Sequence, residues 1–284
     1  MRLFRPLAPL LALLLAGCSG ATLVDALVPS DGYHVAGDLR YRDGPRGTLD
    51  VYVPDAEEKS PPLVIFLYGG GWESGAKEDY RFAGQAFASR GYVTAIPDYR
   101  LYPEVKFPDF LRDAAAAVVW ARRHAAEWGA ADGPVFLIGH SAGAHIAAML
   151  TLDERWLAEA GMPVGETVRA TVGLAGPYDF LPLTDPVLME IFGPEATRSE
   201  SQPINFVDGT EPPMLLATGT DDTRVRPRNT ANLAARIAER GGRVETLSYD
   251  GIGHIQLVAA LAAPLRWLAP VLSDIDTYLR RQAP

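Results

Sequence analysis

A single serine stands among small residues where a strand-like run meets a helix-like run, in the stretch VFLIGHSAGAHIAAML, residues 135–150. The turn itself is GHSAG, residues 139–143. Neighbours must be small where a strand turns this tightly into a helix, and the strained backbone presents the serine side chain for reaction. Ser141 is therefore predicted to be a nucleophile, with a simple helix cap as the alternative.

A serine hydroxyl is a poor nucleophile unless a base removes its proton. The chain has five histidines. His34 lies in the first strand-like region, His124 lies within a helical run, and His140 is the neighbour of the serine in the turn. His145 is one turn further along the helix, on a face that we expect to point away from the site. His254 follows the last strand-like run beside a glycine and is predicted to be the base, with helix capping as the alternative.

An imidazole base needs a carboxylate that fixes its tautomer and stabilises its charged form. The stretch ATGTDDTRV offers Asp221 and Asp222 at the end of a strand-like run, and Asp250 lies close to His254 in the sequence. We favour Asp222, because a turn of the form G-x-x-D-x-x-V commonly presents its aspartate in this way. Asp221 and Asp250 remain alternatives.

Backbone amides that stabilise an oxyanion are the fourth component of acyl-transfer chemistry. Three glycines follow another strand-like run in FLYGGGWESG, and their amides are not shielded by side chains. Gly70 and Gly71, together with Ala142 after the nucleophile, are the predicted donors. A glycine turn that only reverses the chain is the alternative.

These residues must be positioned by a sheet, because the chain alternates strand-like and helix-like runs. Such alternation predicts an α/β fold with a mostly parallel central sheet and helices on both faces. Ligands bind such sheets at the carboxyl ends of the strands, where the candidate residues stand. Strands are expected within 33–41, 47–54, 61–70, 91–100, 134–138, 168–176, 212–220 and 243–251, and helices within 76–90, 107–129, 142–152, 226–242 and 254–282. The last helix should break near Pro264 and Pro270. The proline-rich stretch 177–212 lacks periodicity and is expected to form only a small cap.

Composition argues against nucleic acid as a partner. The 284 residues carry a formal charge of −9 without any run of lysines or arginines. Nearly half of the residues are apolar, which is ordinary for a globular protein.

The first residues resemble a bacterial lipoprotein signal. Arg2 and Arg5 precede an apolar run of eleven residues, which is too short to cross a bilayer. The run ends in LAGC, so Cys18, the only cysteine of the chain, is predicted to be lipidated after cleavage. Ordinary signal-peptidase cleavage nearby is the alternative. Cleavage would change the formal charge from −9 to −11, so the lipid would have to provide the attachment.

The predicted organisation is a lipoprotein signal peptide over residues 1–17, a tether over 18–32 and one domain over 33–284. The predicted location is the periplasmic face of a membrane in a bacterial cell envelope. The sequence predicts no oligomeric state.

Taken together, these motifs resemble the α/β-hydrolase superfamily, and they are most similar to esterases of the hormone-sensitive-lipase-like and bacterial feruloyl-esterase-related groups. The motifs that carry the resemblance span residues 45 to 280 and are YGGGW, DYRLYPE, FPDFLRDAAAAVVW, GHSAG, DDTRV and GIGH. Tyr68 departs from the family, which usually has a histidine before these glycines, so the loop must be braced differently. The resemblance also implies a structural ion pair between the segment 98–101 and Asp113.

The expected function is that of a serine carboxylesterase that acts on small or short-chain esters through an acyl-enzyme, with no metal or cofactor. Trp72, Phe180, Leu181 and Phe192 are candidates for a modest apolar substrate pocket, although each is also a plausible core residue. Stretch 177–212 and the segment before residue 45 are too short for a large mobile cover, which argues against long-chain triglycerides. An arylformamidase or other amidase is the alternative reaction, and a non-catalytic binding protein is the alternative of another class.

Overall fold

A computed structural model describes residues 27–55 and 60–283. Cys18 and the predicted signal peptide lie outside the described residues. Within the predicted tether, Val28 is buried against the main hydrophobic core, and the Tyr33 hydroxyl donates a hydrogen bond to the Pro29 carbonyl at 3.1 Å. None of the helices in the described ranges is long and apolar enough to cross a bilayer.

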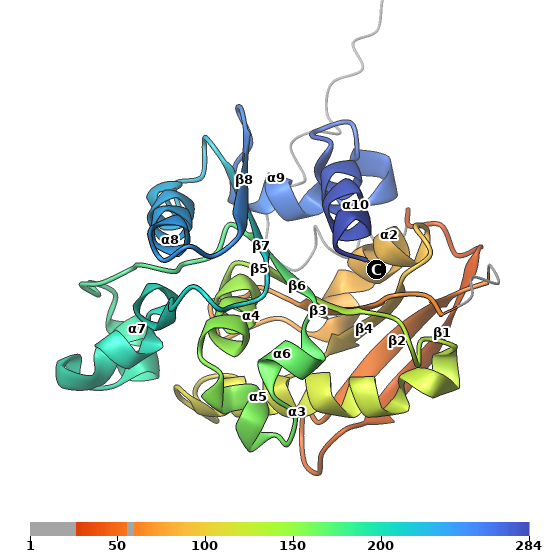
Figure 1. Ribbon diagram of the computed structural model, residues 1–284, viewed down its shortest axis with the longest axis horizontal. Helices are drawn as coiled ribbons and strands as arrows, with labels where there is room; N and C mark the ends of the chain where they lie inside the picture. Colours follow the sequence, from red (N-terminus) through yellow and green to blue (C-terminus); the bar gives the residue numbers. More distant parts are fainter. Residues whose placement is uncertain (1–26, 56–59, 284) are drawn as a thin grey trace, which may run out of the picture.

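An eight-stranded sheet forms the centre of the molecule (Figure 1). Its order is β1-β2-β4-β3-β5-β6-β7-β8. The six strands from β4 to β8 run parallel, whereas β2 is antiparallel to both β1 and β4. The predicted mostly parallel sheet is confirmed. The strands are β1 (Tyr33–Arg40), β2 (Thr48–Pro54), β3 (Leu63–Leu67), β4 (Val93–Pro97), β5 (Val135–His140), β6 (Ala170–Leu174), β7 (Met214–Gly219) and β8 (Val244–Tyr249).

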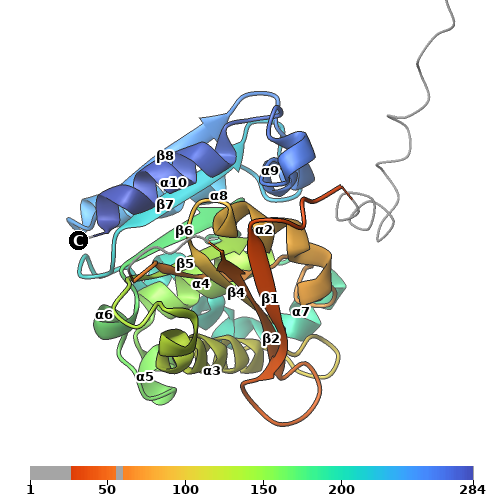
Figure 2. The ribbon, with the colours of Figure 1, turned by 90° about the vertical axis from the view of Figure 1, so that its right-hand side faces the viewer.

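Helices cover both faces of the sheet, as Figures 1 and 2 show from two directions. Every residue of β3, β4, β5, β6 and β7 is buried, which explains why these strands are almost continuously apolar. One face carries α3 (Asp109–His124), α4 (Ala142–Leu152) and α8 (Arg228–Glu239), and the other carries α2 (Arg81–Ala88) and α10 (Val271–Gln282).

Three predicted helices are divided in the structure, one of them being 107–129, which forms α3 and then η3 (Ala125–Trp128). Residues 76–90 form a 3-10 turn, η2 (Lys77–Tyr80), followed by α2, and the C-terminal run forms α9 (His254–Ala259), η6 (Ala263–Leu265) and α10, broken at the two prolines as predicted. The prolines remove helical hydrogen bonds and clash with the preceding turn. Short elements complete the chain: η3 (Ala125–Trp128), α5 (Arg155–Glu159), α6 (Val164–Thr167), α7 (Pro186–Phe192), η4 (Glu195–Ser201) and η5 (Pro203–Phe206).

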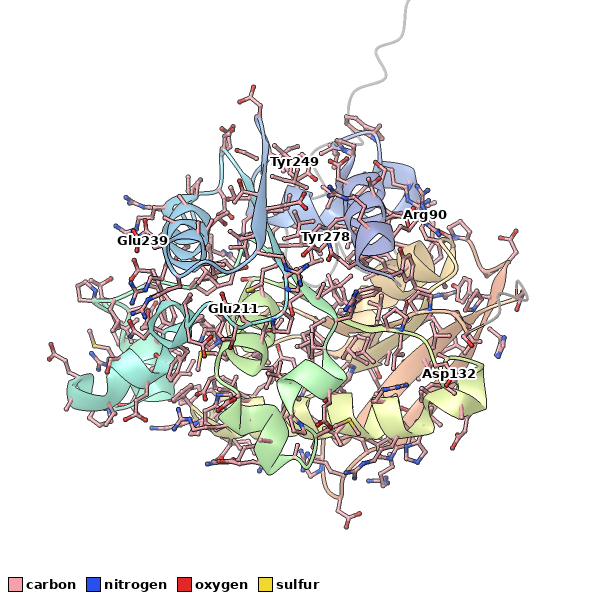
Figure 3. All side chains as sticks on the ribbon, in the orientation of Figure 1. Arg90, Asp132, Glu211, Glu239, Tyr249 and Tyr278 are labelled. Atoms are coloured by element: carbon pink, nitrogen blue, oxygen red, sulfur yellow. The ribbon has the colours of Figure 1, made fainter. Side chains whose placement is uncertain are left out.

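The C-terminal helix α10 packs on the sheet near β6 and β8. Figure 3 labels Tyr249 on β8 and Tyr278 on α10, with side chains filling the space between these two elements. The Tyr249 hydroxyl donates to the Asp274 carboxylate at 2.9 Å. This contact ties α10 to the strand that leads into the loop carrying His254.

Candidate active site

Ser141 lies at the carboxyl end of β5, where the chain turns directly into α4. Its φ of 55° and ψ of −121° place it in a strained conformation that residues other than glycine rarely adopt. The two glycines of the turn leave no room for side chains: a Cβ on Gly139 would lie 2.2 Å from the Gly143 carbonyl oxygen, and one on Gly143 would lie 2.0 Å from the Leu67 carbonyl oxygen. The sequence of the turn is therefore required by how closely β3, β5 and α4 approach one another.

His254 is delivered to the serine by the loop after β8. The Ser141 hydroxyl lies 2.9 Å from His254 Nε2, and His254 Nδ1 lies 2.7 Å from Asp222 Oδ2. The serine and histidine are 9% and 8% exposed, so the pair is largely buried but retains some contact with solvent. With Nδ1–H donating to the carboxylate, Nε2 is free to accept the serine proton.

Asp222 is the carboxylate that the histidine contacts, and it comes from the loop after β7. It also accepts hydrogen bonds from the amides of Arg224 and Val225, at 3.0 and 2.8 Å. Burial alone would raise its pKa, but the hydrogen bonds from His254 and these two amides outweigh burial and lower the pKa below its usual value. The alternatives Asp221 and Asp250 are exposed and share the Thr220 hydroxyl instead, at 3.4 and 3.3 Å.

His140, the histidine of the 139–143 turn, contacts the backbone of His254. Its ring centre lies 4.8 Å from that of His254, and its Nε2–H donates to the His254 carbonyl at 3.2 Å. Burial lowers the pKa of His140 to about 3, with the charge of nearby His254 as a smaller cause. The ring is therefore neutral and fixes the backbone of His254 without placing a second positive charge beside it.

The glycine loop after β3 lies against the nucleophile. A Cβ placed on Gly69 would be 3.0 Å from Ser141 Cβ, so the loop could not approach this closely with another residue at that position. Gly70 and Gly71 have φ values of 141° and 65°, in the region that favours glycine. A side chain on Gly70 would also meet the Ser74 carbonyl oxygen at 2.0 Å.

Carbonyl contacts set the direction of the loop amides. The Gly69 carbonyl accepts from the Tyr80 hydroxyl at 3.4 Å, and the Gly70 carbonyl accepts from the Ser74 amide at 3.0 Å and its hydroxyl at 2.9 Å. In a trans peptide the N–H points opposite to the C=O. The N–H groups of Gly70 and Gly71 therefore point away from these partners, and neither donates a hydrogen bond within residues 27–55 and 60–283. They fit the predicted role of oxyanion donors.

Aromatic rings pack beside this loop. Trp72 lies 4.8 Å from Phe192 and 6.1 Å from Phe180, measured between ring centres. Trp72 and Phe192 are almost fully buried, as expected of core residues, whereas Phe180 and Leu181 are half-buried. Of the four predicted pocket residues, only the last two retain a surface that a substrate could contact without rearrangement.

His145 lies among these rings. It is fully buried and its ring centre is 5.1 Å from Trp72 and 5.7 Å from Phe180. Its Nε2–H donates to the Ser201 carbonyl at 2.8 Å, and burial lowers its pKa to about 4. Helical spacing alone did not reveal this placement, because the rings that surround His145 come from the loops after β3 and β6 and from α7.

The ion pair implied by the family resemblance is present. Arg100 donates from Nε and Nη2 to the two oxygens of Asp113, both at 2.8 Å. Asp98 is not part of this pair and instead contacts Tyr68 and Arg46. Neither the Arg100–Asp113 pair nor Asp98 contacts Ser141, His254 or Asp222, in agreement with a structural role.

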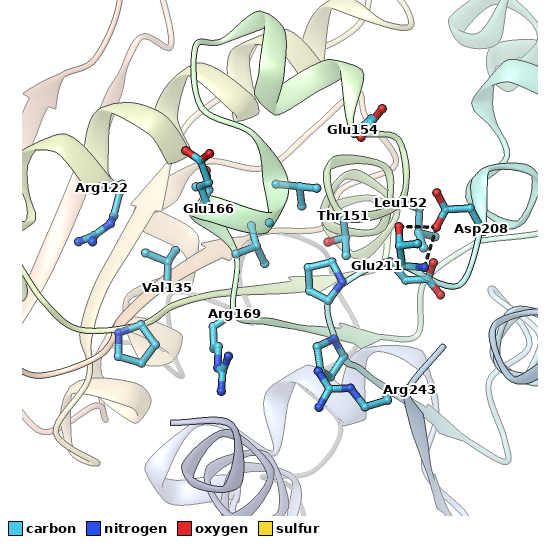
Figure 4. A pocket seen from close by; sticks show the side chains of 18 of the residues that line it. Arg122, Val135, Thr151, Leu152, Glu154, Glu166, Arg169, Asp208, Glu211 and Arg243 are labelled. Atoms are coloured by element: carbon cyan, nitrogen blue, oxygen red, sulfur yellow. Dashed lines mark hydrogen bonds between the residues drawn. The ribbon is translucent and has the colours of Figure 1, made fainter. Parts of the chain in front are cut away.

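A cavity of about 620 Å³ lies at the opposite edge of the sheet (Figure 4). Its lining includes Val135, Arg169 and Arg243, which stand at or just before the amino ends of β5, β6 and β8. No member of the triad lines this cavity. Five carboxylates and three guanidinium groups line it, so the formal charge of the lining is negative.

Comparison with known proteins places the chain among esterase-like sequences. A family model, BD-FAE, matches residues 49–237, which include Ser141 and Asp222 but end before His254. A probable isoprenylcysteine alpha-carbonyl methylesterase of Arabidopsis thaliana is 28% identical over 93% of this chain and 60% of its own length. Esterase LipC of Mycobacterium tuberculosis is 29% identical over 75% of this chain and 58% of its own length. The chain thus spans about three fifths of the curated relatives it matches.

A solved structure has a similar fold over most of the chain. Thermogutta terrifontis esterase 2, in a form phosphoramylated by tabun, superposes with a TM-score of 0.72 at 25% sequence identity. The superposition covers 89% of this chain and 96% of the other.

Proposed function

Because the chain belongs to the BD-FAE family of α/β-hydrolases, we propose that it is a serine carboxylesterase that hydrolyses small carboxylic esters. The observation that carries the proposal is the unbroken hydrogen-bonded chain from the Ser141 hydroxyl through His254 to Asp222, with the amides of the glycine loop beside it. Esterase names among the relatives and the tabun-treated structural neighbour support the same reaction class.

The reaction follows from the positions of these groups. His254 Nε2 takes the hydroxyl proton as Ser141 Oγ attacks the ester carbonyl, and the Asp222 carboxylate stabilises the resulting imidazolium. The negative charge on the carbonyl oxygen is held by the amides of Gly70, Gly71 and Ala142. The imidazolium then protonates the departing alcohol. Water, activated by the same imidazole, cleaves the acyl-enzyme and releases the acid.

Labelling tests the nucleophile directly. A fluorophosphonate probe is expected to add one phosphonyl group to the intact protein, located at Ser141 by peptide mass spectrometry, because only an activated serine displaces fluoride rapidly. Prior heat denaturation should abolish the labelling. An intact protein that remains unlabelled would favour a non-catalytic binding protein.

The packed rings beside the site predict a preference for short acyl groups. Against p-nitrophenyl esters, kcat/KM for acetate and butyrate should exceed that for octanoate by at least about tenfold, because the extra methylenes find no apolar space. Phe180→Ala should shift the preference toward longer chains, since this half-buried ring faces Trp72 and Phe192. Phe206→Ala is the matched control, because that half-buried ring instead contacts Arg155.

The ester panel also examines the alternative reaction and the pocket assignment. Faster turnover of N-formylkynurenine than of any ester in parallel assays would favour the amidase. An unchanged chain-length profile in Phe180→Ala would remove Phe180 from the pocket.

Attachment to a membrane through lipidated Cys18 remains part of the proposal. It rests on the LAGC sequence after the apolar run. We accordingly propose that the enzyme acts from the periplasmic face of a bacterial membrane on small-molecule esters.

A further inference from the structure

We propose that Arg46, on the turn between β1 and β2, is a positioning residue that holds the oxyanion loop in its productive shape by tying its two ends together through Tyr68, Gly75 and Asp98. The inference rests on the proposed serine-esterase function. It assigns a role to a residue outside the range matched by the family model, and it identifies the brace of a loop that begins with tyrosine in place of the usual histidine.

Sheet topology brings this turn to the site. Because β1 is antiparallel to β2 and β2 is antiparallel to β4, the turn over residues 41–47 lies at the carboxyl edge of the parallel strands, beyond the ends of β1 and β2 (Figure 2). The Tyr41 amide donates to the Gly47 carbonyl at 3.0 Å and closes the turn. The Tyr41 hydroxyl donates to the Asp98 carbonyl at 2.7 Å and fastens the turn to the end of β4.

The guanidinium of Arg46 contacts the glycine loop after β3. Arg46 itself has a φ of 53°, an uncommon conformation for a residue with a side chain. Its Nη2 donates to the Tyr68 hydroxyl at 2.6 Å and to the Gly75 carbonyl at 2.5 Å, and its Nε donates to the Tyr99 carbonyl at 2.7 Å. Tyr68 precedes the three glycines and Gly75 follows the turn they begin, so one planar group contacts both ends of the loop.

Asp98 completes the brace. Its Oδ1 accepts from the Tyr68 hydroxyl at 2.7 Å, from the Lys77 amide at 2.9 Å and from Arg46 Nη2 at 3.3 Å. The Tyr68 ring stacks between Tyr80 and Tyr99, with ring centres 5.4 and 4.7 Å away. A buried tyrosine hydroxyl therefore has both a donor and an acceptor, as its burial requires.

Hydrogen bonds to the loop carbonyls fix the orientation of the N–H groups in the same peptide planes. The Tyr99 hydroxyl donates a hydrogen bond to the Tyr68 carbonyl at 2.7 Å, and the Tyr80 hydroxyl donates one to the next carbonyl, that of Gly69. Removing the guanidinium leaves the Gly75 carbonyl and the Tyr68 hydroxyl short of a donor and lets the loop shift. A shift of this kind weakens interactions that strengthen only when charge develops on the substrate oxygen.

Kinetics of Arg46→Met test the proposal, with kcat counted per active site by fluorophosphonate titration. We expect kcat for p-nitrophenyl acetate to fall about tenfold or more with KM nearly unchanged, short of the loss of about a hundredfold or more seen when an oxyanion donor is deleted. Arg46→Lys keeps the charge without the planar fork and should recover part of the loss. Arg40→Met, at an exposed position on β1, should match the wild type.

A second measurement separates positioning from general loosening of the fold. An alkyl trifluoromethyl ketone forms an oxyanion on the serine, so its inhibition constant should rise in Arg46→Met by about the factor by which kcat/KM falls. Tyr68→Phe retains the stacked ring but removes the hydroxyl that Arg46 contacts, and it is the variant to measure if Arg46→Met does not fold. It should lower kcat severalfold.

Wild-type kcat per active site and unchanged ketone inhibition in the folded Arg46 or Tyr68 variants would overturn the proposal. Esterase activity that does not depend on Ser141 would instead overturn the proposed function on which it rests.

Discussion

Ser141→Ala is expected to lower kcat for p-nitrophenyl acetate by about a millionfold, to the level set by binding and the oxyanion donors alone. The hydroxyl is the group that forms the acyl-enzyme, and no other serine lies at the carboxyl end of a strand beside His254 among the described residues. The fold should be retained, because the change removes one oxygen atom and introduces no steric clash.

The measurement needs a check for traces of wild-type enzyme, since a contaminant of about one part in ten thousand would limit the apparent loss to about ten-thousandfold. Titrating the variant preparation with a fluorophosphonate quantifies any active serine. Circular dichroism and the thermal unfolding midpoint should match the wild type. Activity within tenfold of the wild type, with no labelled contaminant, would reject Ser141 as the nucleophile.

Asp222→Asn is expected to lower kcat by about ten-thousandfold while leaving KM nearly unchanged. The carboxylate now accepts a hydrogen bond from His254 Nδ1 at 2.7 Å. An asparagine amide turned to keep its two backbone amide donors would present an N–H to His254, which favours the tautomer with the proton on Nε2. That tautomer cannot accept the Ser141 proton.

Asp221→Asn is the matched control, because it makes the same chemical change one residue away. Asp221 is exposed and contacts the Thr220 hydroxyl at 3.4 Å, so its variant should retain wild-type kcat. A large loss in Asp221→Asn with little change in Asp222→Asn would exchange the roles of the two residues and contradict the geometry.

Local sequence was sufficient for the class of fold and for the candidate nucleophile and base, whereas it favoured Asp222 without excluding Asp221 and Asp250. The strands around Ser141 are nearly continuous apolar runs, because a parallel strand covered on both faces has no polar side, and such runs can be recognised without knowledge of their partners. The glycines of the 139–143 turn are likewise explained by contacts within one strand-turn-helix unit and the strand beside it. The alternation of runs predicted the edge at which the candidate side chains converge.

Other features depended on contacts between segments far apart in the chain. His145 is surrounded by rings that come from three separate segments, so its helical position alone did not indicate this environment. The departure at Tyr68 showed that the loop needed a different brace, but not which residue supplied it.

The sequence by itself determined the class of fold, the candidate nucleophile and the base, because each depends on local patterns of apolar, small and titratable residues. Only the tertiary structure decided which aspartate meets His254, which rings surround His145, and that Arg46 reaches the loop at Gly75. These last contacts depend on strand order and register, which bring together residues separated by about 30 or more positions and which no local pattern encodes.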